Sequence, residues 1–473
     1  MDIKLHRTTV GPRLYQQICK QFRQTIADGS CRPGVRVPSI RDLADQLQIS
    51  RGTVEIAYGI LISEGYLVAR GRLGTIVSPC VSPQQVSDAL AGNEESELGD
   101  ERRAYDATRA GNGSDIGLPA RDLFPYKLWM KLLGKHLRQH ATLLSQRSPV
   151  GYIPLRAAIA GHLSIFRGVS CHAEQIFIVP GYRCAINLVA HVLLGTGDSV
   201  LYEDPSLRFP KLLLAKHGIA AIPIPVDDQG MRLSAGNNLD PGARLAIVSP
   251  TRQSVFGTPM SVSRRRELAT WAERSGAYVL EDGYSNEFAQ GDRPSSASPN
   301  PGARTLYMGS FAKSISPITH LTYLAITPDL VDRFNEACGT FYDSTPIVDQ
   351  SVIASFISEG HYTRHLKKIR QIYVDRHRML AEAMDSVFGT RFKTSDNISN
   401  LSLLATIDES ENDQEMASKA RSRGFPVTAI SSLYSDQAVE KRKGLMIEFS
   451  AISSRERAFF DCRALEQAMD GVD

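Results

Sequence analysis

Alternating apolar and helical segments constrain the fold of this chain most strongly. Between residues 170 and 330, short apolar runs typical of buried strands are separated by helix-like stretches. The strand-like runs are residues 174–180, 198–204, 219–226, 244–250, 277–282 and 305–310. Strands separated by helices indicate a mostly parallel sheet, whose ligands gather at the carboxyl ends of the strands. We therefore predict an α/β domain over residues 114–473, with a ligand site at one edge of its sheet.

Polar residues stand at four of the predicted strand ends, where ligands are expected. They are Gly181 with Tyr182 and Arg183, Glu203 with Asp204, Asp282 with Tyr284, and Lys313 in a Ser-x-x-Lys turn that starts at Ser310. A single lysine is most often a solvated surface residue, and a strand-end aspartate is often a structural cap. The combination in this order, however, is typical of a pyridoxal phosphate site.

Each of these residues would have a chemical task in such a site. Lys313 would form a Schiff base with the aldehyde, and Asp282 would keep the pyridine nitrogen protonated so that the ring withdraws electrons. The Tyr284 hydroxyl would bond to the ring O3′. Backbone amides after Gly181 would receive the phosphate at a helix N-terminus, where the helix dipole favours anions.

The composition is that of a globular protein without membrane segments. The 473 residues are 42% hydrophobic, which suits two or three domains. The sequence has no apolar run of 18 residues and no signal peptide at its N-terminus, so we expect a cytoplasmic protein that does not enter a membrane. The seven cysteines include no Cys-x-x-Cys pair, which argues against a zinc site or a disulfide framework.

The first 79 residues form a separate basic segment. They hold 11 Lys and Arg against 6 Asp and Glu, a net charge of +5 that suits a polyanionic partner. Helices are predicted over residues 14–26, after the capping residue Ser39, and over residues 51–66 after the capping residue Ser50. This pattern indicates a helix-turn-helix, and the two strands that follow around a glycine-rich tip indicate a wing. Residues 80–113, rich in Ser, Gly, Asn and acidic residues, are predicted to be a flexible linker.

The basic segment contains the motif "RPGVRVPSIRDLADQLQISRGTVEIAYGILISEGYLVARGRLGTIV" over residues 32–77. Through this motif it resembles the GntR family of winged helix-turn-helix repressors. The resemblance implies that the start of the third helix enters the major groove of a double-stranded DNA operator. The candidate DNA-binding residues are Arg41, Ser50, Arg51, Thr53, Arg70 and Arg72. Arg51 would read guanine, whereas Arg72 at the wing tip, with Arg70 behind it, would contact a phosphate or the minor groove.

The part beyond the linker carries the motifs "SPVGYIPLRAAIAGHL", "GDSVLYEDP", "EDGYSNEF" and "GSFAKSISP". Through these motifs it resembles the fold-type-I aminotransferases. Their fusion to a GntR-type head resembles the MocR family of bacterial transcriptional regulators. The resemblance implies a fold like that of the transferases that depend on pyridoxal 5′-phosphate, binding of this cofactor, and a homodimer held together by the large domain.

The cofactor motifs depart from the family pattern at several positions. His320, retained as a candidate cofactor contact, stands where the family usually has a phosphate-binding arginine. Leu207 replaces a tyrosine expected to stack on the ring, and Gln146 replaces one that would reach the neighbouring subunit's phosphate. Met446 stands near the place of the arginine that clamps a substrate carboxylate. Arg183 is a candidate to supply the missing phosphate charge, because it follows Gly181 in the predicted phosphate-binding turn.

The sequence thus predicts a sequence-specific DNA-binding transcriptional regulator. Its aminotransferase-like domain would sense a small effector through pyridoxal phosphate on Lys313. The resemblance implies an amino acid, an amine, vitamin B6 or a rhizopine-like compound as effector. Two alternatives stay open at this point: a regulator whose effector pocket binds no cofactor, and an active aminotransferase. The missing arginine at Met446 disfavours the enzyme.

Overall fold

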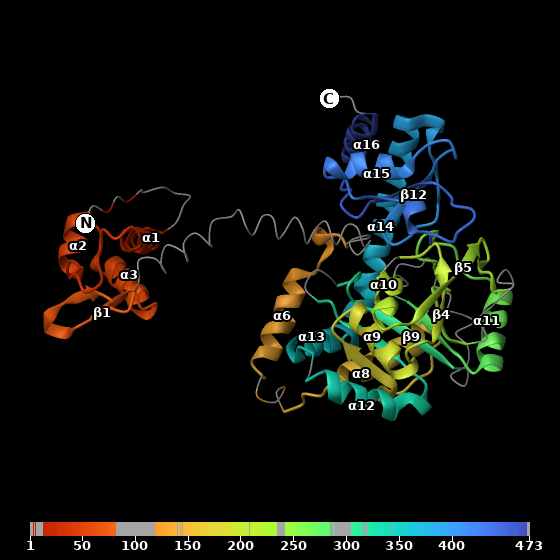
Figure 1. Cartoon of the computed structure of the whole chain (residues 1–473), viewed down its shortest axis with the longest axis horizontal. Helices are drawn as coiled ribbons and strands as arrows, with labels where there is room; N and C mark the ends of the chain where they lie inside the picture. The colour runs from red at the N-terminus through yellow and green to blue at the C-terminus, as the bar shows by residue number, and fades with distance from the viewer. Residues whose placement is uncertain are drawn as a thin grey trace. The chain divides into compact units, whose positions relative to one another are not determined.

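The computed structural model describes residues 3, 5, 13–81, 119–139, 141, 143, 145–207, 209–233, 242–283, 287, 304–315, 319–343 and 345–470, with Arg72, Phe209 and Asp470 described by their backbone alone. The chain divides into two compact units, Met1–Thr108 and Arg109–Asp473 (Figure 1). Within the described part of the chain, none of the helices is long and apolar enough to cross a bilayer.

The first unit is a winged helix-turn-helix. Its elements are α1 (Leu14–Ala27), α2 (Ile40–Leu47), α3 (Arg51–Ser63), β1 (Leu67–Ala69) and β2 (Thr75–Val77). Ser39 and Ser50 cap α2 and α3, because each side chain accepts a hydrogen bond from a backbone amide in the first turn. Helix α3 ends earlier than the predicted residue 66, because Gly65 adopts a left-handed φ of 82° and the Tyr66 amide donates back to the Leu61 carbonyl.

The second unit is built on a sheet with strand order β3-β10-β9-β8-β7-β4-β5-β6. The strands are β3 (Ile176–Val179), β4 (Ser199–Asp204), β5 (Ala220–Asp227), β6 (Gly230–Met231), β7 (Ala243–Val248), β8 (Tyr278–Asp282), β9 (Thr305–Ser310) and β10 (Thr322–Ala325). Strands β9, β8, β7, β4 and β5 are parallel, which confirms the predicted mostly parallel sheet. Strand β10 is antiparallel to both β3 and β9, so β3 runs in the same direction as β9.

Helices cover both faces of this sheet (Figure 1). One face packs against α9 (Tyr182–Leu193), α10 (Phe209–Lys216) and α12 (Val331–Phe341); the other packs against α8 (Ile153–Arg167), α11 (Val262–Ser275) and α13 (Ile347–Ser358), with α6 (Tyr126–Leu137) outside α13. Because successive strand residues point to opposite faces, Asp282 shares the α9 face with Leu280, whereas Glu281 shares the α11 face with Val279.

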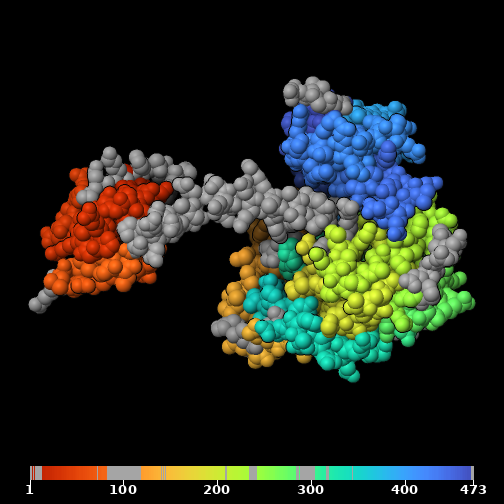
Figure 2. Space-filling model, in the orientation of Figure 1, coloured from red at the N-terminus to blue at the C-terminus, as the bar shows by residue number. Residues whose placement is uncertain are grey.

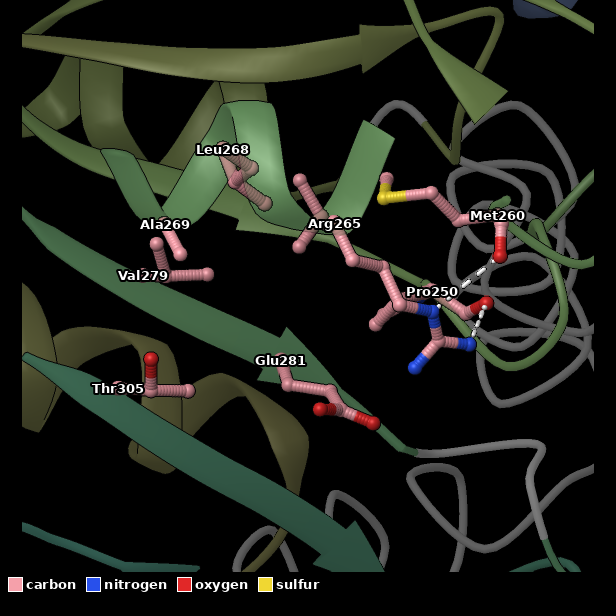
Figure 3. A pocket seen from close by; sticks show the side chains of 9 residues that line it. Pro250, Met260, Arg265, Leu268, Ala269, Val279, Glu281 and Thr305 are labelled. Carbon is pink, nitrogen blue, oxygen red and sulfur yellow. Dashed lines mark hydrogen bonds between the residues drawn. The ribbon is translucent and has the colours of Figure 1, made fainter. Parts of the chain in front are cut away.

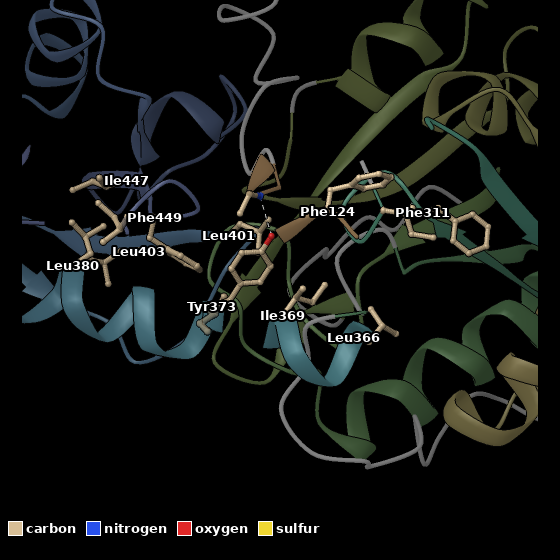
Figure 4. Close-up of a cluster of buried hydrophobic side chains, with 14 of the residues drawn as sticks. Phe124, Phe311, Leu366, Ile369, Tyr373, Leu380, Leu401, Leu403, Ile447 and Phe449 are labelled. Carbon is tan, nitrogen blue, oxygen red and sulfur yellow. Dashed lines mark hydrogen bonds between the residues drawn. The ribbon is translucent and has the colours of Figure 1, made fainter. Parts of the chain in front are cut away.

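The C-terminal part of the second unit forms a smaller lobe, drawn in blue in Figure 2. Its antiparallel sheet consists of β11 (Lys393–Thr394), β12 (Ser402–Thr406), β14 (Gly444–Glu448) and β13 (Val427–Ala429), with α15 (Asp413–Ser422) and α16 (Arg455–Asp470) packed nearby. The long helix α14 (His361–Phe388) connects the two lobes. Its Leu366, Ile369, Tyr373 and Leu380 are buried, and the Tyr373 hydroxyl accepts a 3.0 Å hydrogen bond from the Ala120 amide (Figure 4).

Candidate DNA-binding face and effector site

The start of α3 presents an exposed polar surface. Arg51 is the first residue of the helix and is exposed, as is Arg41 on α2. The Ser50 side chain accepts a hydrogen bond from the Thr53 amide at 3.2 Å, and the two hydroxyl oxygens lie 2.8 Å apart. These contacts fix the first turn of α3, so Arg51 projects from a rigid helix terminus.

The wing adds further basic residues to this unit. Arg70 is exposed directly after β1, and the turn Gly71–Leu73 leads into β2. Arg72 lies in this turn, but its side chain is outside the described residues. Sequence reasoning missed Arg36. Its backbone pairs with Ile76 of the wing, and its guanidinium lies so close to Gly74 that a Cβ added there would be only 2.7 Å away. No local pattern marks Arg36, because the pairing joins segments far apart in the sequence.

Three predicted effector-site residues come together at one edge of the large sheet. Gly181 follows β3, Asp282 ends β8, and Lys313 lies in the turn after β9. These strands run in the same direction, so their carboxyl ends meet at the same edge. Tyr284, the fourth predicted member, lies outside the described residues.

Lys313 is a buried amine and not a solvated surface lysine, since its residue is only 5% exposed. Its Nζ donates a 2.5 Å hydrogen bond to Oδ1 of Asn400, a buried residue of the smaller lobe. Burial lowers the pKa of Lys313 from 10.5 to about 7, although the nearby Glu448 and Asp282 carboxylates act in the opposite direction. A large share of Lys313 is therefore the unprotonated amine at neutral pH, which is the form that attacks carbonyl compounds.

The carboxylate of Asp282 contacts Tyr182. The sequence predicts both residues in the same site but does not predict this contact. The hydroxyl of Tyr182, the first residue of α9, donates a 2.7 Å hydrogen bond to Oδ2 of Asp282. This bond joins the predicted phosphate-binding turn to the carboxylate predicted to pair with a pyridine nitrogen.

The other predicted cofactor contacts surround this edge. Gly181 has a left-handed φ of 94°, and a Cβ there would meet the His320 carbonyl oxygen at 3.4 Å. The His320 side chain is exposed, as is that of Arg183 in the first turn of α9. The buried Ser310 hydroxyl accepts from the Ala312 amide at 3.2 Å, which organises the turn that carries the lysine.

The substituted positions of the motif lie as follows. Met446 is 1% exposed and packs in an apolar cluster with Phe256, so its position offers no cation to a carboxylate. Leu207 is half-buried, and Gln146 is exposed. Glu448 and Asn400 were missed by sequence reasoning, because both reach Lys313 from a different lobe.

A small cavity of about 30 Å³ lies on the face of the sheet opposite α9, under α11 (Figure 3). Its polar side chains are Thr305, the buried Glu281 and Arg265, and Arg265 donates to the Met260 and Pro250 carbonyls at 3.2 and 2.6 Å. Burial raises the pKa of Glu281 to about 7 despite the positive charge of Arg265. This carboxyl therefore titrates near neutral pH next to the strand end that carries Asp282.

Comparison with known proteins accounts for both units. Residues 14–77 match the family model described as bacterial regulatory proteins, gntR family. The chain is 28% identical to the uncharacterized HTH-type transcriptional regulator YdeL of Bacillus subtilis, over 96% of this chain and 97% of YdeL. It is also 28% identical to the probable rhizopine catabolism regulatory protein MocR of Rhizobium meliloti, over 88% of this chain and 86% of MocR.

The chain thus combines a GntR-type head with a second unit, and its relatives over most of its length include MocR and other HTH-type regulators. The second unit shares its fold with solved aminotransferases. Pyrococcus horikoshii kynurenine aminotransferase, solved in complex with PMP, superimposes with a TM-score of 0.67 and 21% identity, over 78% of this chain and 95% of that enzyme. The predicted fold class and family resemblance are thus confirmed, and the homologues over most of the length are transcriptional regulators.

Proposed function

We propose that the chain regulates transcription by binding an operator through α3 and the wing, and that its aminotransferase-like unit senses a small effector. The observation that carries the proposal is the pairing of two features in one chain. A capped helix terminus presents exposed Arg51, and a separate unit holds Lys313 as a buried amine whose pKa is affected by the Glu448 and Asp282 carboxylates. The first suits reading of DNA, and the second suits capture of a carbonyl-bearing ligand.

The arginines of the first unit would divide the work of DNA binding. Arg51 would donate two hydrogen bonds to guanine O6 and N7, whereas Arg70 would contact phosphates. Arg51→Ala should therefore cost about 1 to 3 kcal/mol on the operator and relax the preference at one base pair. Arg70→Ala should weaken binding to operator and random DNA alike. Band-shift titrations of both variants on both DNAs test this division, and an equal loss on both DNAs for Arg51→Ala would refute it.

The effector-site residues fit a pyridoxal phosphate group. Gly181 leaves room for close approach at the N-terminus of α9, where backbone amides would hold a phosphate. Asp282 would hold a proton on the ring nitrogen, and Lys313 would hold the aldehyde carbon. When bound, the group would supply an electron-withdrawing ring and a carbon that exchanges amines. Arg183 and His320 would border the phosphate end.

Reduction with borohydride tests whether pyridoxal phosphate attaches to Lys313. The full-length protein is incubated with pyridoxal phosphate, reduced, and digested, and the labelled peptide is identified by mass spectrometry. We expect the label on Lys313 and its loss in Lys313→Ala. An unlabelled protein that still binds its operator would favour the alternative of an effector pocket without cofactor.

We further propose that the large unit forms a homodimer through helix α6. Tyr126, Met130 and Leu137 lie on one side of this helix and are 53%, 62% and 50% exposed. A neighbouring side of the helix buries Trp129 and Leu132 against the core. An exposed apolar stripe beside a buried one is expected for a helix that packs between two subunits. A two-fold dimer would place two heads on paired half-sites.

A further inference from the structure

Tyr182 extends between the two groups that would hold the ends of a cofactor ring. Its backbone is at the N-terminus of α9, directly after Gly181, and its hydroxyl reaches Oδ2 of Asp282 at 2.7 Å. A pyridoxal phosphate held by the same helix terminus and the same carboxylate would extend over the same interval. The phenol ring would therefore compete with the ring of such a cofactor for the space between the helix terminus and Asp282.

Asn400 makes a similar contact with Lys313, the residue that would hold the aldehyde of the cofactor. Its Oδ1 accepts the 2.5 Å hydrogen bond from Lys313 Nζ, and the side chains of both residues are buried. The two residues before Asn400 bind to the large lobe. Arg252 donates to the Ile398 carbonyl at 2.5 Å, and the Ser399 hydroxyl donates to the Ser254 carbonyl at 3.0 Å. The amide is thus presented to the lysine by a fixed backbone.

Covalent attachment would weaken this second contact. If Lys313 held an aldehyde, the Nζ lone pair would bond to the aldehyde carbon, and the carbonyl oxygen would leave as water with the two hydrogens of the neutral amine. The neutral imine nitrogen would have no hydrogen to donate, so Asn400 Oδ1 would lose the hydrogen bond that it accepts from the free amine. Asn400 therefore stabilises the free amine relative to the attached one.

We propose that Tyr182 and Asn400 hold the effector site in a self-bonded state and that a cofactor binds by displacing both. This inference rests on the proposed cofactor on Lys313 and concerns its regulation. Each displaced hydrogen bond weakens cofactor binding, so occupancy of the site follows the concentration of free cofactor instead of saturating at low levels. The side chains of Tyr182 and Asn400 act as competitors of the cofactor.

The first test removes only the Tyr182 hydroxyl. Tyr182→Phe in the full chain should bind pyridoxal phosphate about tenfold more tightly, the change expected for one hydrogen bond to a charged group. The matched control is Tyr278→Phe, which removes another tyrosine–aspartate hydrogen bond, 2.9 Å to Asp329, at the opposite end of the same strand β8. Affinity is measured by the absorbance of the bound cofactor, and the control should match the wild type.

The second test removes the amide. Asn400→Gly suits the backbone, because Asn400 has a left-handed φ of 48°, a conformation that glycine adopts readily. The variant should attach pyridoxal phosphate to Lys313 faster, as read by borohydride labelling over time. Asn397→Gly, at an exposed asparagine of the same segment, is the control.

The outcomes separate the two proposals. Tighter or faster binding in Tyr182→Phe and Asn400→Gly, with unchanged controls, supports the competition. Unchanged or weaker binding in both variants, while the wild type is labelled at Lys313, overturns the competition and leaves the cofactor in place. If neither the wild type nor any variant is labelled, including Tyr182→Ala, which removes the ring, both the cofactor and the competition are overturned.

Discussion

The low pKa of Lys313 predicts how its reaction with pyridoxal phosphate depends on pH. Burial lowers this pKa from 10.5 to about 7, and an amine is reactive only without its proton. Lys313 is therefore unprotonated at pH 7 far more often than an ordinary lysine, which is unprotonated in roughly one molecule in 3000. Attachment at Lys313 should therefore rise between about pH 6 and 8 and level off above.

The assay is brief exposure to the cofactor at a series of pH values, followed by borohydride and mass spectrometry. The peptide with the exposed Lys367 serves as the reference within each sample. Glu448→Gln gives a directional check, because the Glu448 carboxylate raises the Lys313 pKa and its removal should move the midpoint to lower pH. A midpoint near pH 10, or a midpoint that Glu448→Gln moves upward, would refute the assigned burial and charge environment.

Three further predictions follow from the second unit. Burial raises the pKa of Glu281 to about 7, so the folded state binds this proton more tightly than the unfolded state does. The free energy of unfolding should therefore fall as pH rises from 5 to 7. Glu281→Gln should make that fall smaller, as measured by chemical denaturation. Met130→Glu, which places a charge in the α6 stripe, should shift the protein from dimer to monomer in light scattering without loss of melting temperature, and a persistent dimer would exclude this face. Gly181→Ala should lower cofactor affinity and stability together, since alanine strains the left-handed backbone; unchanged thermal melting would contradict that reason.

Local sequence patterns were sufficient for the helix starts of the first unit and for strands β3, β4, β5, β7, β8 and β9 of the large sheet, but not for the smaller lobe. Ser39 and Ser50 predict the helix starts because each hydroxyl accepts a hydrogen bond from an amide only three residues later in the sequence. The order of strands and helices likewise predicts a mostly parallel sheet, because crossover helices leave few other arrangements. The same reasoning placed Gly181, Asp282 and Lys313 at one sheet edge, since the carboxyl ends of parallel strands are expected to meet.

The state of the effector site was decided only by tertiary structure. The Tyr182 hydroxyl meets Asp282 because α9 packs on the face of the sheet to which Asp282 points, and this follows from the register of several strands. Asn400 contacts Lys313 because the smaller lobe packs against the large one. The local sequence around residue 400 does not predict that contact. The pKa of Lys313 has the same origin: it depends on how completely distant segments exclude water from one amine. Periodicity and capping are properties of neighbouring residues, whereas burial and pairing at this site belong to residues brought together from the whole domain.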